Sequence, residues 1–110
     1  MTELKITDTV EGTGTAAVKG ALCLCHYEGF LDDGTKFDSS RDHGRPFQFV
    51  IGVGRVIKGW DQGIMGMKEG GKRTLYVPAH LGYGERVKST IPAHSNLTFH
   101  VEMIEVRPRE

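Results

Sequence analysis

Apolar and polar residues alternate most regularly in the segment from Leu97 to Met103. Every second position there is apolar, and Thr98, His100 and Glu102 occupy the positions between them. A period of two places all the apolar side chains on one face of an extended chain. The segment therefore predicts a half-buried strand, and its polar second face favours an antiparallel sheet.

Four further segments have the composition of strands and end at turn-forming residues. They are Ala21–Leu31, Lys36–Asp38, Phe47–Ile51 and Arg73–Val77. The first two are separated by Asp32–Thr35, which contains an Asp-Gly pair typical of a tight turn, so we expect them to form a hairpin. Gly52 and Gly54 follow the third segment and Pro78 follows the fourth, which marks where these strands end.

One segment has a helical period instead. At the angular spacing of a helix, its large apolar side chains fall within one arc of about 100°; they are Val56, Ile57, Trp60, Ile64 and Met67. Gly59, Gly63 and Gly66 lie beside this arc, and each costs a helix roughly 1 kcal/mol relative to alanine. Packing must therefore hold the helix, and glycine allows another backbone to approach it closely. We expect an α+β fold, in which a strongly twisted antiparallel sheet of about five strands wraps around one short α-helix.

Composition and charge exclude several classes of protein. The 110 residues suit a single domain over residues 1–110, and the 14 basic residues balance the 14 acidic ones. Nucleic acids and anionic membranes attract a surplus of positive charge, so neither is an expected partner. The N-terminal segment lacks the apolar core of a signal peptide, and no apolar run approaches the ~18 residues of a membrane span. These features predict a cytoplasmic protein.

The two cysteines, Cys23 and Cys25, lie two residues apart in a predicted strand. Their Cα atoms would be about 6.6 Å apart, at the edge of the range that a disulfide tolerates. We therefore expect reduced thiols in the core, as is usual in the cytosol. A redox or metal-binding role for the pair is the alternative.

Residues that often carry chemistry are not arranged for it here. The five histidines have no metal-ligand spacing, so no metal is expected. Ser39 and Ser40 lack the G-x-S-x-G context of a nucleophile. The segment from Gly66 to Arg73 has the glycines of a phosphate-binding loop, but an arginine stands where the hydroxyl residue belongs. The sequence therefore predicts no cofactor.

What remains is a set of aromatic and branched side chains close to predicted turns. They are Tyr27, Phe37, Phe47, Phe49, Trp60, Tyr83 and Phe99, with Val56, Ile57 and Ile91. The carboxyl group of Asp38 and the hydroxyl of Tyr83 lie among them. All of these side chains could be ordinary core, which is the interpretation we prefer for Phe49. The other interpretation is that Trp60 forms the floor of an apolar pocket.

The sequence resembles the FKBP-type peptidyl-prolyl cis-trans isomerases. The resemblance rests on a series of short motifs in the family's order over nearly the whole chain. They are Tyr27-Glu28-Gly29, Asp33-Gly34-Thr35-Lys36-Phe37-Asp38-Ser39-Ser40-Arg41-Asp42, Pro46-Phe47, Gly52-x-Gly54-x-Val56-Ile57-Lys58-Gly59-Trp60-Asp61, Gly66-Met67-x-x-Gly70, Gly82-Tyr83-Gly84, Ile91-Pro92 and Leu97-x-Phe99. The family's fold is a twisted antiparallel sheet around a short helix, as the periodicity predicts. The resemblance implies an enzyme that rotates X-Pro peptide bonds in proteins and so assists folding.

The resemblance also implies a set of site residues. Trp60 would form the floor of a proline pocket, with walls from Tyr27, Phe37, Phe47, Val56, Ile57 and Phe99, and with Tyr83 and Ile91 above it. Asp38 and Tyr83 would be the catalytic polar groups, and the Ile57 backbone N–H would bind a carbonyl. The expected partners are proline-containing polypeptides and the macrolides FK506 and rapamycin, and the expected state is a monomer without a cofactor.

Three features depart from the family's pattern. His43 stands where an arginine is common, Arg55 occurs at the start of the predicted helix, and the loop Glu85–Thr90 is more charged than usual. These changes concern the rim of the pocket, and therefore substrate preference, more than activity. Two other functions stay open from the sequence: a module that docks a proline-containing partner without useful turnover, and a holdase chaperone. The combination of Asp38, Trp60 and Tyr83 argues against simple docking.

Overall fold

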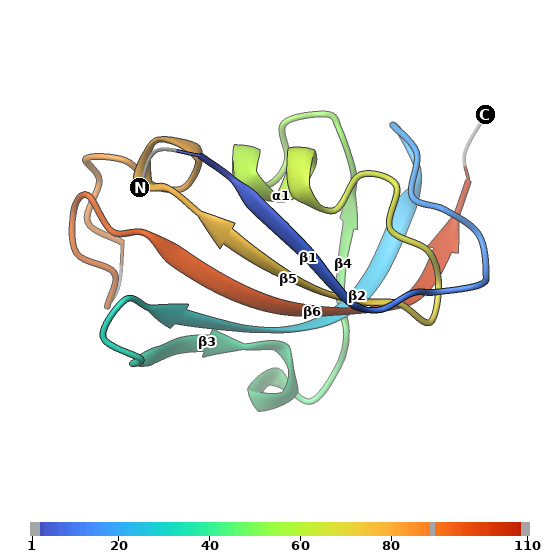
Figure 1. Cartoon of the computed structure of the whole chain (residues 1–110), viewed down its shortest axis with the longest axis horizontal. Helices are drawn as coiled ribbons and strands as arrows, with labels where there is room; N and C mark the ends of the chain where they lie inside the picture. Colours follow the sequence, from blue (N-terminus) through green and yellow to red (C-terminus); the bar gives the residue numbers. More distant parts are fainter. Residues whose placement is uncertain (1–2, 89, 109–110) are drawn as a thin grey trace.

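The computed structural model describes residues 3–88 and 90–108 (Figure 1). In this part of the chain one antiparallel sheet contains β1 (Lys5–Val10), β2 (Leu22–Leu31), β3 (Lys36–Ser39), β4 (Phe47–Val50), β5 (Lys72–Val77) and β6 (Leu97–Arg107). One α-helix, α1 (Lys58–Gly63), and two 3-10 turns, η1 (Ser40–His43) and η2 (Ala79–Leu81), lie between the strands. The expected α+β class is confirmed, with a 6-stranded sheet where about five strands were expected.

The long strand β2 is the strand with the most partners in the sheet, since it pairs with β3, β4 and β6. The sheet runs β1-β5-β6-β2-β3, and β4 also pairs with β2. β4 pairs with the first part of β2, from Leu22 to Cys25, whereas β3 pairs with the part from Glu28 to Phe30. The two short strands therefore lie end to end along the same edge of β2, with the turn η1 between them. This split edge carries several of the predicted site residues.

The alternation predicted for the C-terminal strand is confirmed. Leu97, Phe99, Val101 and Met103 are all buried in β6. Cys25 of β2 pairs with Met103 while the preceding Leu24 pairs with Glu105, so one extra residue of β6 forms a bulge. The bulge shifts the alternation by one position, which exposes Ile104 and returns the end of the strand to the core.

The helix α1 lies on one side of the sheet (Figure 1), and it is shorter than the apolar arc predicted. Trp60, Ile64 and Met67 are buried, but only the first of them lies within the helix bounds. The carboxylate of Asp61 accepts hydrogen bonds from the backbone N–H groups of Gly52, at 2.8 Å, and Gly54, at 2.9 Å. These bonds tie the preceding loop to the helix and set the direction in which the chain enters it.

The strand β1 is the element that the sequence analysis did not predict. All six of its side chains are exposed, and it pairs only with β5, at the edge of the sheet. An exposed edge strand needs no apolar face, so it leaves no alternating pattern in the sequence. Its position is fixed by backbone pairing and by the ion pair of Asp8 with Arg73 of β5, at 2.6 Å.

Cys23 and Cys25 are free thiols, both buried in the core of β2. Burial raises the pKa of Cys23 to about 11 and that of Cys25 to about 12, the latter with a further contribution from the charge of Cys23. The prediction of unbonded core thiols is confirmed.

In the described part of the chain, no helix has the length and apolar character that a membrane-crossing helix needs.

Candidate active site

A cavity of about 440 Å³ opens beside α1, where the helix, β2, β3 and two loops meet. The residues that line it are Tyr27, Phe37, Asp38, Phe47, Gly54, Arg55, Val56, Ile57, Trp60, Gly82, Tyr83, Arg86, Lys88 and Phe99. Every residue that the sequence analysis placed in the proline pocket, except Ile91, belongs to this set. Residues from opposite ends of the chain are thus brought around one cavity.

Trp60 lies at the base of this cavity, surrounded by aromatic rings. Its ring centroid is 5.0 Å from that of Tyr27, 5.3 Å from that of Phe99 and 5.8 Å from that of Phe47, with interplanar angles of 81°, 86° and 79°. Such edge-to-face contacts are the favoured geometry of aromatic pairs and hold the rings in place. Trp60 itself is only 4% exposed. Phe49, which we assigned to the core, packs on the same indole and does not line the cavity.

The indole N–H of Trp60 is buried and has no hydrogen-bond acceptor among the described residues. A buried donor left unpaired costs about 1–3 kcal/mol. Buried polar groups without partners are uncommon, and each one calls for a physical reason. Trp60 therefore contributes apolar surface, and no hydrogen bond, to the lining of the cavity.

A glycine in β2 makes room for one wall of the cavity. Gly29 pairs with Asp38 of β3 and with Phe99 of β6. A Cβ atom at Gly29 would lie 2.5 Å from the Cζ atom of Phe37, which is closer than van der Waals contact permits. The ring of Phe37 therefore rests directly on the backbone of β2, and this position brings it 5.7 Å from the ring of Phe99. The sequence motif contained this glycine but gave no reason for it.

The carboxylate of Asp38 is the acidic group of the cavity lining, and its oxygens are held by several donors. The hydroxyl of Tyr27 donates to Oδ2 at 2.6 Å, and the backbone N–H of Ser39 donates to Oδ1 at 2.8 Å. Nε2 of His43 lies 3.0 Å from Oδ1. Partial burial would raise the pKa of Asp38, but the bonds from Tyr27, His43 and Ser39 outweigh it and hold that pKa below its usual range. The group is therefore ionised at neutral pH. Burial raises the pKa of Tyr27, and its hydrogen bond to Asp38 raises that pKa further.

Two hydrogen-bond donors of the cavity have no partner among the described residues. They are the hydroxyl of Tyr83 and the backbone N–H of Ile57, which precedes the first turn of α1. Tyr83 follows η2, and its ring lies 4.8 Å from the ammonium group of Lys88. An apolar cavity with a few convergent polar groups is the usual form of a site for a small ligand or a short segment of peptide.

Ile91 is the predicted site residue that does not line the cavity. It is 5% exposed and packs in the core, while its backbone forms two hydrogen bonds with Lys88, of 2.8 and 3.0 Å. Its packing therefore anchors the loop that carries Lys88. The sequence analysis did not include three cationic lining residues, Arg55, Arg86 and Lys88, in the pocket, although it noted their segments as departures from the family.

The described residues contain no group of three or more histidine, cysteine, aspartate or glutamate side chains that could hold a metal ion. The fold and the cavity define a class of α+β domain in which an antiparallel sheet wraps a short helix and leaves an aromatic binding site beside it. Comparison with known proteins shows which family within this class the chain belongs to.

Residues 13–104 match the family described as FKBP-type peptidyl-prolyl cis-trans isomerase. An FK506-binding protein of Neisseria meningitidis serogroup A is 52% identical over 107 residues, which cover 96% of this chain and 98% of that protein. Human peptidyl-prolyl cis-trans isomerase FKBP2 is 51% identical over 92 residues, which cover 83% of this chain and 65% of that protein. The crystal structure of AtFKBP13 superposes with a TM-score of 0.87 at 47% identity, covering 93% of this chain and 91% of that one.

The chain therefore belongs to the FKBP-type peptidyl-prolyl cis-trans isomerases, and it is an enzyme of that activity. The family predicted from the sequence motifs is confirmed, and so is the fold that this resemblance implied.

Proposed function

We propose that the cavity above Trp60 is where the chain isomerises X-Pro bonds, with the proline ring of the substrate lying on the indole. The observation that carries this proposal is the box of aromatic rings set edge-on around Trp60. A proline ring is apolar and compact, and a cavity of about 440 Å³ accommodates it with its neighbouring peptide groups. The substrates are exposed X-Pro segments of polypeptides, and the cellular role is assistance to protein folding in the cytoplasm by a monomer.

Isomerisation in such a site needs no covalent chemistry. A planar prolyl amide is stabilised by resonance, and rotation about its C–N bond has a barrier of ~18–20 kcal/mol. Twisting the bond breaks the resonance and reduces the amide dipole, so an apolar and dry site favours the twisted form over the planar one. Only such a differential effect accelerates a reaction. Raising a rate of ~0.01 per second to ~10 per second requires about 4 kcal/mol.

Three polar groups of the site have roles in this proposal. The hydroxyl of Tyr83 and the backbone N–H of Ile57 donate hydrogen bonds to substrate carbonyls on either side of the rotating bond. The carboxylate of Asp38 stays ionised, and its negative charge favours the twisted amide because the carbonyl carbon gains positive character when the resonance is lost. Hydrogen bonds to neutral groups contribute about 0.5–1.5 kcal/mol each, so these groups and desolvation together reach the required magnitude.

FK506 and rapamycin bind the same cavity in this proposal. The pipecolinyl ring of both macrolides resembles proline and would occupy the position of the substrate ring on Trp60. Support comes from the family to which the chain belongs and from the relative named an FK506-binding protein. Bound macrolide and substrate would therefore compete.

A protease-coupled assay on a peptide with leucine before proline tests the assignment. Tyr83→Phe removes one donor and keeps the ring, so kcat/KM should fall about 2- to 12-fold. Asp38→Ala should reduce kcat/KM only partially, because no residue acts covalently. Asp42→Ala is a matched control, since Asp42 is an exposed carboxylate of η1 outside the cavity lining, and it should change kcat/KM less than twofold. Loss of all activity in a folded Asp38→Ala protein, or equal effects of both aspartate variants, would contradict the proposal.

A further inference from the structure

Arg73 belongs to the face of β5 that packs on the helix. It lies two residues before the buried Leu75, and alternate residues of a strand share one face. Its side chain is 12% exposed, whereas the basic side chains in the other ion pairs of residues 3–88 and 90–108 are 43–64% exposed. A guanidinium group stays charged and carries only donors, so at this depth its N–H groups need acceptors from the protein.

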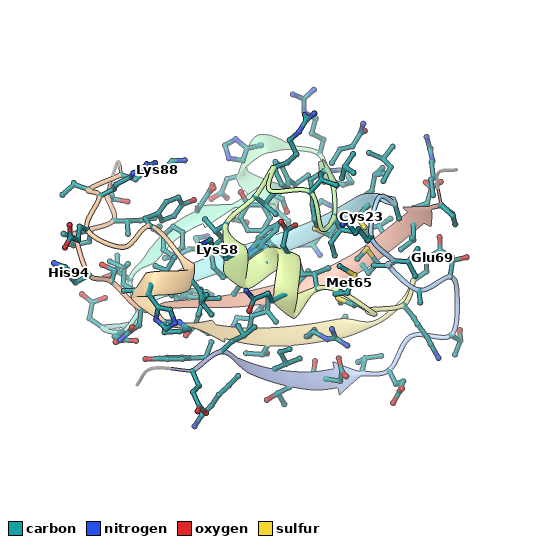
Figure 2. All side chains as sticks on the ribbon, turned by 90° about the horizontal axis from the view of Figure 1, so that it is seen from above. Cys23, Lys58, Met65, Glu69, Lys88 and His94 are labelled. Atoms are coloured by element: carbon teal, nitrogen blue, oxygen red, sulfur yellow. The ribbon has the colours of Figure 1, made fainter. Side chains whose placement is uncertain are left out.

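Two different sets of acceptors meet the guanidinium group of Arg73. On one edge, Nε donates to Oδ1 of Asp8 at 2.6 Å and Nη2 donates to Oδ2 at 3.3 Å. On the other edge, Nη1 donates to the backbone carbonyl of Gly63 at 2.8 Å and to that of Met65 at 3.3 Å. Figure 2 shows Met65 where the chain leaves α1. We call Asp8 and Arg73 the helix clamp, because together they connect the edge strand β1 to the end of the helix.

The carbonyl groups at the end of α1 depend on a partner from outside the helix. The last carbonyls of a helix have no N–H group within it to accept from, and a cation beside them is also favoured by the helix dipole. α1 has 6 residues, and two of them, Gly59 and Gly63, are glycines that weaken it. Its position therefore depends on the contacts that hold its two ends.

The helix clamp acts on the turn that contains Trp60. The carbonyl of Trp60 accepts the N–H of Ile64 at 2.9 Å. The two carbonyls bound by Arg73 belong to the residues on either side of Ile64. The start of the helix is held separately, by the bonds of Asp61 to the preceding loop. Loss of the clamp therefore leaves the helix fixed at its start and free to shift at its end, and the indole moves with it.

We propose that Arg73 is a positioning residue of this isomerase, which holds the floor of the cavity in place through the end of α1, and that Asp8 orients Arg73. The proposal rests on the proposed function, because it assumes that catalysis takes place above Trp60. The structure describes all residues of β1, and none of them lines the cavity. The proposal therefore gives an edge strand that does not touch the substrate a role in catalysis.

Substitutions of the two residues should lower activity by different amounts. A misplacement of about 1 Å in a catalytic site can cost 100-fold, so a smaller shift of the floor in Arg73→Gln should lower kcat/KM about 5- to 20-fold. Asp8→Asn leaves the bonds to the helix possible and removes only the ion pair, so a loss of about 1.5- to 5-fold is expected. Because Asp8 acts only through Arg73, the double variant should lose no more than Arg73→Gln alone. Losses that multiply would overturn the coupling.

The test separates positioning from stability by measuring folded protein only. For each variant, kcat/KM for the peptide with leucine before proline and the emission of Trp60 are measured at a temperature at which unfolding curves show it to be fully folded. A residue that only stabilises the fold leaves both quantities unchanged there, whereas the clamp predicts a lower kcat/KM and a changed emission. Asp8 is 43% exposed, so Asp8→Asn supplies the same test if Arg73→Gln does not fold.

The possible results distinguish the clamp from the proposed function. Unchanged kcat/KM and emission in the folded variants, or a loss of activity with unchanged emission, would overturn the clamp. A changed emission with unchanged kcat/KM would show that the clamp holds Trp60 but that catalysis takes place elsewhere. That result would refute the proposed function and, with it, the role of Arg73 in catalysis.

The matched control is a second ion pair, between Glu105 and Arg107 of β6, at 2.6 Å. Both of its side chains lie outside the cavity lining, and they are 41% and 60% exposed. Arg107→Gln has the same change in net charge as Arg73→Gln, and Glu105→Gln has the same change as Asp8→Asn. Each control should change kcat/KM less than about twofold, because an exposed ion pair contributes little. Equal losses in the controls would show that net charge, and not the clamp, is responsible, and would overturn the proposal.

Discussion

The helix α1 packs so closely on the sheet at Gly59 that there is no room for even a single methyl group at this position. A Cβ atom there would lie 2.5 Å from Cγ1, 2.9 Å from Cγ2 and 3.2 Å from Cβ of Val77. Val77 is fully buried in β5 and is branched at Cβ, so rotation about its χ1 angle is restricted and its side chain has little room to turn away. Replacement of Gly59 by alanine must therefore move the helix away from the sheet.

The expected loss of stability follows from two opposing contributions. Alanine is favoured over glycine in a helix by about 1 kcal/mol, whereas inserting a methyl group into a packed core costs about 1–3 kcal/mol. Because both branches of Val77 are too close, we expect a cost near the upper end, so that Gly59→Ala lowers the free energy of unfolding by about 1–2 kcal/mol. Trp60 is the next residue, so the same movement shifts the floor of the cavity. A displacement of about 1 Å in a catalytic site can reduce activity 100-fold, and kcat/KM should therefore fall by more than the stability loss alone explains.

A double-mutant cycle tests this reasoning. Val77→Ala removes the two γ carbons that the new methyl group would meet, and in that background Gly59→Ala should be neutral or stabilising by up to ~1 kcal/mol. The two substitutions should thus show a coupling of about 1–3 kcal/mol in urea unfolding followed by Trp60 fluorescence. A stabilising Gly59→Ala in the wild-type background, or a coupling near zero, would refute the close approach of helix and sheet.

Three further results are expected. Gly29→Ala should push the ring of Phe37 out of the cavity wall and weaken substrate binding, seen as a higher KM with the protein still folded; an unchanged KM would contradict the contact. Tyr27→Phe should raise the pKa of Asp38, followed by carboxyl NMR during a pH titration. The lowered pKa of Asp38 stabilises the folded protein at every pH above the pKa of this carboxyl in the unfolded chain, and this stabilisation is lost as the pH falls through its pKa in the folded protein. The variant should therefore lose less free energy of unfolding on acidification than the wild type. Burial raises the pKa of both core thiols above their usual value of 9.0. The free energy of unfolding should therefore be unaffected by these thiols below pH 9.0 and should fall as the pH rises from there towards about 11. An equal fall after both cysteines are replaced by alanine would argue against this cause.

The parts of the fold that were predicted from the sequence are those with one buried and one exposed face. The alternation from Leu97 to Met103 and the turn at Asp32–Thr35 were both confirmed, because each depends on local pattern. β1 was missed because all its side chains are exposed. The helix was expected to include Val56, but Ile57 is in an extended conformation and the helix begins after it.

The candidate site depended on the family motifs more than on periodicity. Spacing alone could not bring Tyr27 next to Asp38, since that contact depends on the pairing of β2 with β3. Ile91 could not be distinguished from a pocket residue, because packing in the core and contact with a cavity require the same apolar side chain. The role of Gly29 depends on the position of one aromatic ring across the strand, which only the three-dimensional structure supplies.

The most direct test of the central claim is a titration with rapamycin in which isomerase activity and Trp60 emission are measured in the same sample. Trp60 is the one tryptophan of the chain, so its emission reports on the floor of the cavity alone. If catalysis takes place above Trp60, both signals should change together and saturate at one ligand per chain. Activity that persists unchanged while the Trp60 emission saturates would place catalysis elsewhere, and micromolar rapamycin without effect on either signal would contradict the assignment of the proline pocket.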